Sequence, residues 1–524
     1  MAPEMPSPAA RPLPPWARKA ALFVGVFVSG ASVMIVEVLG SRVLGPFFGI
    51  GLFVWSALLT VTLTALAAGY YLGGALADRA GSLRLPPRLI VAAGCLVALI
   101  PLCSDAVLTF SDGFGIRLGA LLSAFLLFGP CLVVMGMVTT AATRQAMLEV
   151  ARPGRAAGIV YSVSTLGGLS GTLLTGFVLV PRWELATTWA VTAGALILAG
   201  SIGSYIETRS PLSGAALLLL LPALAAPDRR LGEHIRVLER SESLRGKLSV
   251  IQDDSRNVPL RLLRVDHSFV GGQWETGDPA FAFVHLLEGV RLARPEGREL
   301  LQIGLGIGSL SMAMAKVGIR TDAVEIDPEV IRLAEKYFGY VPTGKVYAED
   351  ARVTIRELRR RYDFIVHDTF TGGNVPEHLL SVDVLQRLQE LLQPGGVLAL
   401  NLVGAENGPL SRATRAVDRT LRHVFQHVRV FRDGPLDEKA HTISNLIFFA
   451  SALPIVFAQP AEFESPACER ILRNFEHWEV VRAVDPLSPL VTDAKNPLAR
   501  LSFPVAEAFR TAMNELYPVE FWLR

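Results

Sequence analysis

The chain has 524 residues and a formal net charge of +2, but its charges are spread unevenly. Only 21 of the first 227 residues are Asp, Glu, Lys or Arg, against 77 of the remaining 297. An ordinary globular protein has about 25% charged residues, so only the second part fits that class. A single soluble domain and a chain embedded in a membrane throughout are both excluded. The balanced charge also gives no support to nucleic acid as a partner.

Residues 1–18 are rich in Pro and Ala and are predicted to form a disordered tail. Residues 19–227 are predicted to form a transmembrane domain of six or seven helices, because six apolar runs reach the length of about 20 residues that spans a bilayer. The seventh run has 16 residues and includes Pro222. The runs cover residues 20–40, 52–76, 89–110, 118–140, 156–180, 185–206 and 211–226.

Basic residues are frequent in alternate connecting segments, starting with the N-terminal tail, so this tail is predicted to be cytoplasmic. Six spans would return the chain to the cytoplasm, whereas seven would put the soluble part outside. We favour six spans and an interfacial or re-entrant seventh run, which makes the soluble domain cytoplasmic.

Three features within the apolar runs indicate helix packing. Glu37 is an intramembrane carboxylate, which is costly unless it is paired or functional, and pairing with Arg42 or a loop dipole is expected. The pairs Gly69/Gly73 and Gly167/Gly171 have the spacing that allows two helices to approach closely.

The four cysteines are Cys95, Cys103, Cys131 and Cys468, and their spacing suggests neither a zinc site nor a disulfide framework. They are interpreted as small buried hydrophobic residues, and no metal site is expected.

The soluble part begins with a small β domain, predicted over residues 228–280. Two β-like runs, 248–251 and 260–265, flank the polar turn 253–257. Residues 281–524 alternate between helix and strand patterns, which predicts a Rossmann-like parallel α/β sheet of the methyltransferase type.

The strongest motif is Gly304-Leu-Gly306-Ile-Gly308, an apolar strand running into a glycine turn and then a helix. Glycines are needed where the backbone turns sharply and approaches a ligand closely. Serine stands at position 309, where a dinucleotide fingerprint has glycine, so an adenosyl ligand without pyrophosphate fits better than a nicotinamide cofactor.

Acidic residues follow the next three predicted strands, at the edge where ligands bind in open α/β sheets. Glu325 can accept hydrogen bonds from ribose hydroxyls, and Asp350 can accept one from an adenine amino group. Asp368 ends the fourth strand. Asp327 precedes a proline and is predicted mainly to cap the following helix.

With these motifs in place, residues from about 240 to 450 resemble the spermidine synthase family of polyamine aminopropyltransferases, and most closely its bacterial membrane-fused, spermidine synthase-like branch. The matching segments are 303–309, 324–330, 334–338, 350–351, 362–368, 375–380 and 392–396. Thr492-Asp493 and Asn496-Pro497 are similar to a late motif of the same branch, whose role the sequence does not reveal.

The resemblance implies transfer of an aminopropyl group from decarboxylated S-adenosylmethionine to an amine, with Asp368 as the proton acceptor. It implies that Gln273, Glu325, Asp350, Ala351 and Pro376 bind the donor with the glycine loop. Cofactors are then co-substrates only, with none tightly bound. The implied setting is a multi-pass protein of the bacterial inner membrane, in contact with the lipid bilayer and associated as a homodimer.

Three positions depart from the family pattern around the amine. Ile307 occupies the place of an Asp in the glycine loop, and Thr371 replaces an acid beyond the catalytic Asp. Phe283-Val284-His285 stands where the family has Tyr-His-Glu, so His285 and Thr371 are candidate substrate-binding residues. A cationic amine needs carboxylates when it leaves water, so a putrescine acceptor is in doubt.

Three functions therefore remain open. The leading one is a membrane-bound aminopropyltransferase-like enzyme. The first alternative is an S-adenosylmethionine-dependent methyltransferase, which suits Ile307. The second is a non-catalytic membrane transporter or sensor whose soluble domain binds an adenosyl ligand.

Overall fold

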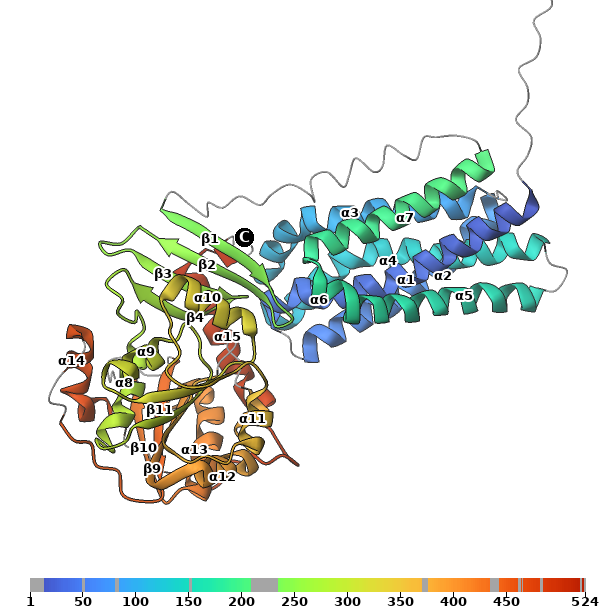
Figure 1. The fold of residues 1–524 in the computed structure, drawn as a ribbon. Coiled ribbons are helices and arrows are strands. Elements are labelled where there is room, and N and C mark those ends of the chain that lie inside the picture. Colours follow the sequence, from blue (N-terminus) through green and yellow to red (C-terminus); the bar gives the residue numbers. More distant parts are fainter. Residues whose placement is uncertain are drawn as a thin grey trace, which may run out of the picture. The chain divides into compact units, whose positions relative to one another are not determined.

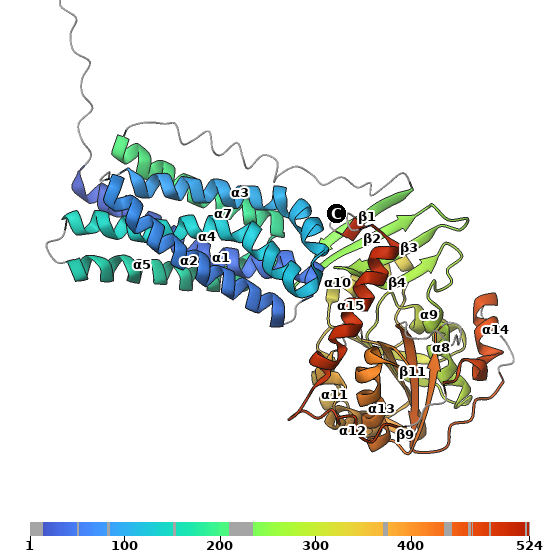
Figure 2. The ribbon, with the colours of Figure 1, turned by 180° about the vertical axis from the view of Figure 1, so that it is seen from behind.

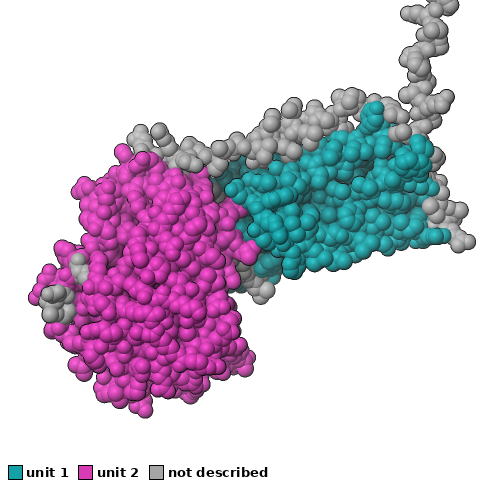
Figure 3. Space-filling view, in the orientation of Figure 1, with its two compact units in different colours: residues 1–227, 523 teal, residues 228–522, 524 magenta. Residues whose placement is uncertain are grey.

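The computed structural model describes residues 14–49, 52–80, 84–149, 153–208, 234–369, 376–433, 443–459, 463, 465–480, 484–518 and 521–522. The chain divides into two compact units, one within residues 1–227 and one within 228–522 (Figure 3). The apolar run 211–226, Thr371 and most of the expected N-terminal tail lie outside the described residues.

The first unit is helical, and six of its described helices are long and apolar enough to cross a membrane. These segments have 23 to 33 residues, so they extend beyond the predicted apolar runs. The fifth span passes through a π-helical turn, Thr175–Leu179. The helices are α1 (Pro15–Phe48), α2 (Leu52–Ala80), α3 (Leu85–Asp112), α4 (Gly115–Glu149), α5 (Pro153–Leu174), α6 (Val180–Arg182) and α7 (Leu185–Thr208).

The two glycine pairs lie where helices of this unit approach each other. A Cβ on Gly69 would stand 2.2 Å from the Val133 carbonyl oxygen of α4. A Cβ on Gly167 would stand 2.2 Å from the Phe27 carbonyl oxygen of α1. Glycine is therefore required for close helix contact at these points. Glu37 is buried in α1, and the Thr62 side chain of α2 hydrogen-bonds to it.

The second unit begins with a four-stranded antiparallel sheet in sequential order. Its residues alternate with the pleat, so one face buries Ile251, Leu260 and Leu262 against Tyr517 and other aromatic residues near the end of the chain. Tyr517 also donates a hydrogen bond of 3.0 Å to Asp253. The strands are β1 (Ile235–Glu242), β2 (Lys247–Asp253), β3 (Leu260–Val265) and β4 (Ser268–Trp274).

The main sheet has seven strands in the order β10-β11-β9-β8-β5-β6-β7. Strands β9, β8, β5, β6 and β7 are parallel, and β11 is antiparallel to both of its neighbours. The order reverses between β5 and β8, where a doubly wound sheet opens its ligand crevice. The strands are β5 (Glu299–Ile303), β6 (Arg320–Val324), β7 (Val346–Tyr347), β8 (Tyr362–His367), β9 (Leu392–Gly404), β10 (His427–Arg432) and β11 (Ser444–Ser451).

Helices cover both faces of this sheet, as Figures 1 and 2 show from opposite sides. One buried cluster joins the sheet to α11, α12, α13 and α15, and the other joins it to α8, α9 and α14. The helices are α8 (Ala282–Glu288), α9 (Ser309–Lys316), α10 (Pro328–Phe338), α11 (Ala351–Glu357), α12 (Val382–Leu391), α13 (Arg412–Val424), α14 (Pro466–Leu472) and α15 (Leu498–Leu516).

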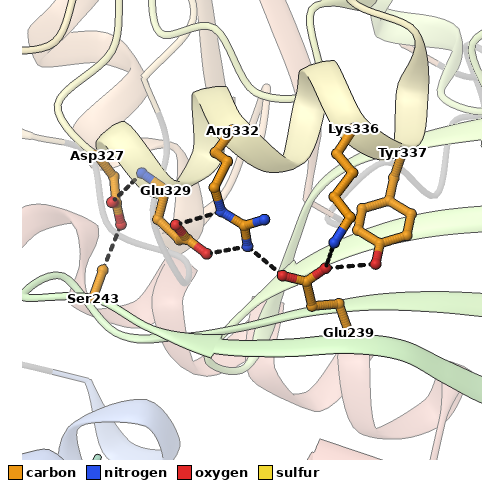
Figure 4. Close-up of polar contacts among 7 residues, drawn as sticks. All are labelled: Glu239, Ser243, Asp327, Glu329, Arg332, Lys336 and Tyr337. Carbon is orange, nitrogen blue, oxygen red and sulfur yellow. Dashed lines mark hydrogen bonds and ion pairs between the residues drawn. The ribbon is translucent and has the colours of Figure 1, made fainter. Parts of the chain in front are cut away.

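An ionic network links the small sheet to α10 (Figure 4). Glu239 of β1 accepts hydrogen bonds from Lys336 at 2.6 Å and Tyr337 at 2.5 Å, and pairs with Arg332. Burial opposes ionisation of Glu239, but these donors prevail and lower its pKa to about 2. The network therefore fixes α10, whose first turn follows the acidic end of β6, against β1.

We expect acid to weaken this junction. Because the folded-state pKa of Glu239 is depressed, its stabilisation is complete above the ordinary pKa near 4.5 and is lost as the pH falls toward 2. Solvent screening limits the effect to about 1 kcal/mol. Urea unfolding of the soluble unit in the full-length protein, followed by tryptophan fluorescence, should show a smaller loss of stability between pH 5 and 3 in Glu239→Gln. The exposed Glu275→Gln control should follow the wild type, and equal slopes in all three proteins would contradict the expectation.

Candidate functional site

The glycine loop leaves β5 at the point where the strand order reverses. Gly304 has φ +86°, and a Cβ there would lie 2.1 Å from the Asp368 carbonyl oxygen. Gly308 caps α9 with φ +78° and faces the Tyr340 ring. Gly306 also has positive φ, +57°. These conformations favour glycine, so the loop can pass directly under the end of β8.

Glu325 follows β6 beside this loop. Its carboxylate accepts hydrogen bonds from the Leu305 amide at 3.1 Å and the Asp327 amide at 3.0 Å. Burial raises the pKa of Glu325, and these backbone donors oppose the rise. A carboxylate oxygen can accept two hydrogen bonds, so capacity remains for ribose hydroxyls. Asp327 caps α10 by accepting from the Glu329 amide, as predicted from the sequence.

Asp350 and Ala351 lie at the start of α11. One Asp350 oxygen accepts from the Arg352 amide at 2.8 Å, which makes this residue the N-cap of the helix. The other oxygen lies 3.7 Å from His378 Nε2. The side chain expected to meet adenine thus also has a structural role, and Ala351 is buried.

Asp368 directly follows β8 and is partly buried. Burial raises its pKa to about 6, although a hydrogen bond of 2.8 Å from the Asn401 amide group stabilises the charged form. Asn401 also donates to Asn445 at 3.2 Å, and Asn445 donates to Asp433 at 3.4 Å. A carboxyl group with this pKa is mostly ionised near neutral pH and can accept a proton.

The remaining predicted site residues lie in different surroundings. Gln273, in β4, donates to the carbonyl oxygens of Gly277 at 3.2 Å and Phe338 at 3.4 Å. Pro376 precedes a short 3-10 helix, Glu377–Leu379. His285 is buried in α8 and pairs with Glu288, and Thr371 lies outside the described residues.

Ile307 packs into the core below the small sheet. It is 2% exposed and shares a buried cluster with Leu248, Leu263 and Val330. A Cβ on Gly271 would lie 2.6 Å from its Cγ1 atom. At this loop position the chain therefore offers no charge to a ligand.

One group of polar residues was not predicted, and a second was noticed in the sequence as a motif without a known role. The first is the Asn401–Asn445–Asp433 series behind Asp368, for which the only sequence signal is a polar residue within the apolar strand 397–402. The second explains the late motif: Asp493 pairs with Arg352 beside Asp350, and Asn496 donates to the Glu377 carbonyl oxygen at 2.8 Å. The late motif thus holds the segment after Pro376 near α11.

The strand order, the glycine loop and the acids at the strand ends define a Rossmann-like domain of the methyltransferase type. Residues 284–431 match the model of the spermine/spermidine synthase domain. This part of the chain is therefore similar to a spermidine synthase domain, as the sequence motifs indicated.

Curated relatives include two kinds of transferase. The chain is 34% identical over 251 residues to an N-terminal histidine N-methyltransferase of Emericella nidulans, covering 43% of this chain and 44% of that protein. It is 38% identical over 128 residues to a polyamine aminopropyltransferase of Vibrio vulnificus, covering 23% and 43%. The chain thus spans less than half the length of these relatives.

Among solved structures, a probable spermidine synthase from Corynebacterium glutamicum aligns with a TM-score of 0.41 and 19% identity. The alignment covers 50% of this chain and 98% of that structure.

Proposed function

We propose that the soluble unit is a transferase that moves an alkyl group from an adenosyl sulfonium donor to a nitrogen acceptor. Asp368 carries this proposal, because it lies beside the glycine loop at the strand-order reversal and has a pKa near 6. The acceptor nitrogen attacks the carbon bound to sulfur, so a C–N bond forms and the C–S bond breaks. The sulfur leaves as a neutral thioether, and Asp368 accepts the proton released from nitrogen.

Glu325 is proposed to bind the ribose, because it stands at the end of β6 with acceptor capacity left after its backbone hydrogen bonds. Asp350 and Ala351 are proposed to face the adenine, with Gln273 and Pro376 along the walls. In these roles the protein orients the donor carbon and keeps an acceptor for the proton nearby.

The packing of Ile307 favours S-adenosylmethionine, and hence methyl transfer. The tail of decarboxylated S-adenosylmethionine carries a lone ammonium group, which needs a carboxylate partner when it is desolvated. The side chain at this loop position is apolar and buried. The methionine group of S-adenosylmethionine carries a compensating carboxylate, so its net charge needs no such partner. Methyl transfer is therefore the first candidate, whereas the family resemblance alone favours aminopropyl transfer.

Aminopropyl transfer from decarboxylated S-adenosylmethionine is the second candidate. The spermine/spermidine synthase domain match and the identity with the Vibrio vulnificus aminopropyltransferase favour it. Both candidates use the same crevice and the same proton acceptor, and differ in what surrounds the donor tail.

The six apolar helices support a protein embedded in a lipid bilayer. We propose a bacterial inner membrane, with the soluble unit in the cytoplasm where the donor is made, and a homodimer as its state. A reporter active only in the cytoplasm, fused after Arg524, should give signal. Signal from a reporter active only outside the cytoplasm would contradict this placement.

Calorimetric titration of the detergent-purified protein tests the choice of donor. We expect S-adenosylmethionine to bind more tightly than decarboxylated S-adenosylmethionine or methylthioadenosine. Glu325→Ala should weaken donor binding at least about tenfold, because a hydrogen bond to a charged group contributes about 1.5–3 kcal/mol. The matched control is Glu349→Ala, whose carboxylate accepts from Thr354 Oγ1 at 2.9 Å; it should change binding less than about twofold.

Tighter binding of the decarboxylated donor would instead support aminopropyl transfer. If none of the three compounds binds, the proposed site is wrong. Equal losses of donor affinity in Glu325→Ala and Glu349→Ala would contradict the ribose-binding role of Glu325. Such a result would leave the proposed donor site itself in place.

A further inference from the structure

A second cluster of reactive side chains joins α8 to α14. His285 and Glu288 of α8 meet Cys468 of α14, and the three side chains are 3%, 1% and 1% exposed. Helices α8, α9 and α14 lie together on one face of the main sheet (Figures 1 and 2). The three residues are therefore enclosed in the folded unit although 180 positions separate Glu288 from Cys468.

The side chains are arranged around a single carboxylate. His285 Nδ1 lies 2.9 Å from Glu288 Oε1, and Cys468 Sγ lies 3.4 Å from Glu288 Oε2. One donor atom from each residue lies within 4.8 Å of the other two. Ligands bound about 2.0–2.3 Å from a tetrahedral zinc ion are separated by about 3.3–3.7 Å, so small side-chain shifts suffice to bring all three onto one ion.

A cavity of about 20 Å³ adjoins the cluster and is lined by all three residues together with Met312 and Ala313 of α9. That volume holds a single water molecule or ion. His285 Nε2 is buried and has no hydrogen-bond partner among the described residues. One ring nitrogen of a residue that lines this cavity is thus unsatisfied.

The buried carboxylate of Glu288 is a second reason to expect a cation at this place. A buried charge is costly unless it is paired, and among the described side chains Glu288 is hydrogen-bonded to the imidazole of His285 and the thiol of Cys468. Lys316 also lines the cavity, but its side chain is exposed, and none of the described ion pairs joins it to Glu288. A divalent cation held by the three side chains would supply positive charge to the Glu288 carboxylate.

We propose that His285, Glu288 and Cys468 bind one zinc ion, with a water molecule from the cavity as the fourth ligand. Nitrogen, carboxylate oxygen and thiolate sulfur are the ligand types that zinc takes in proteins. The ion would link α8 to α14, and its binding would release the thiol proton of Cys468. The sequence predicted no metal, because the ligands come from distant segments and Cys468 has no second cysteine near it. The inference does not depend on the transferase activity.

Cobalt is the probe for this site, because a thiolate bound to Co²⁺ gives intense charge-transfer absorption in the near ultraviolet. The full-length protein, purified in detergent and stripped with a chelator, should bind one equivalent of Co²⁺ with these bands. Zn²⁺ should then displace the cobalt and remove the absorption. Zn²⁺ should also raise the thermal transition of the stripped protein.

Two substitutions test the ligands. Cys468→Ser should abolish the charge-transfer bands and weaken Co²⁺ binding at least tenfold, and the nearly isosteric Glu288→Gln should weaken binding similarly. Cys131→Ser is the matched control, because Cys131 is equally buried in α4 and should leave the spectrum unchanged. Absence of stoichiometric Co²⁺ binding in the folded wild type, or bands that survive in Cys468→Ser, would overturn the proposal and leave a hydrogen-bonded cluster without metal.

Discussion

Replacing Asp368 with Asn is expected to lower kcat by about 10²–10⁴-fold, the usual contribution of a positioned general base. The amide has nearly the same shape but cannot accept the acceptor's proton. Donor binding and the thermal transition should change little, because Asn401 can still contact the new side chain. The measurement is single-turnover transfer together with donor titration, using the acceptor found by mass spectrometry.

The pH dependence of kcat/KM is a second test of the role of Asp368. The raised pKa of Asp368 means that the active, ionised form is lost as the pH falls through about 6. The acidic limb of kcat/KM should therefore lie near pH 6 in the wild type and be absent from the residual activity of Asp368→Asn.

Asp363 provides the control, since it lies on the same strand and accepts hydrogen bonds from the Arg298 and Glu299 amides instead. Asp363→Asn should leave kcat within about twofold of the wild type. Donor binding with unimpaired transfer in Asp368→Asn would remove the residue from the mechanism. Donor binding with no transfer even by the wild type would favour the sensor alternative.

Gly304→Ala is expected to have the second large effect. The new methyl group would lie 2.1 Å from the Asp368 carbonyl oxygen, so the loop or the end of β8 must move. A misplacement of about 1 Å can reduce turnover about 100-fold, because the reacting groups lose their alignment. We therefore expect transfer to fall by at least this factor and donor binding to weaken with it.

Gly318→Ala separates this effect from backbone strain. Gly318 also has positive φ, +75°, but a Cβ there meets no atom within 4 Å. It should cost about 1 kcal/mol of stability and leave transfer unchanged. If both variants had the same activity, the close contact between the glycine loop and Asp368 would be irrelevant to function.

The parts of the site that sequence could predict are those written in short local patterns. The glycine turn after β5 and the acids after β6 and β8 lie within a few residues of apolar strands. Because the carboxyl ends of parallel strands lie at the same edge of a sheet, the sequence predicts that these residues lie close together. The fold class followed from the same patterns, and six spans followed from apolar length. The helices proved longer than the runs because they continue into less apolar ends, such as the end of α1, which contains Pro46.

Other features depend on the order of elements in space, which no local pattern records. Asn401 meets Asp368 only because β9 lies next to β8. Asp493 meets Arg352 across 141 positions, so its motif could be noticed but its role could not be derived. Ile307 packs inward against residues of the small sheet. The comparison with the family pattern predicted only that position 307 lacks the charge of an Asp.

The contact between Tyr517 and the small sheet has a consequence for synthesis. Tyr517 and Asp253 are 264 positions apart, so β2 leaves the ribosome long before the aromatic residues that complete its buried face. During that interval Ile251, Leu260 and Leu262 lack their final partners. The second unit therefore cannot finish folding until Tyr517 and its aromatic neighbours have been translated, well after the six apolar helices have emerged.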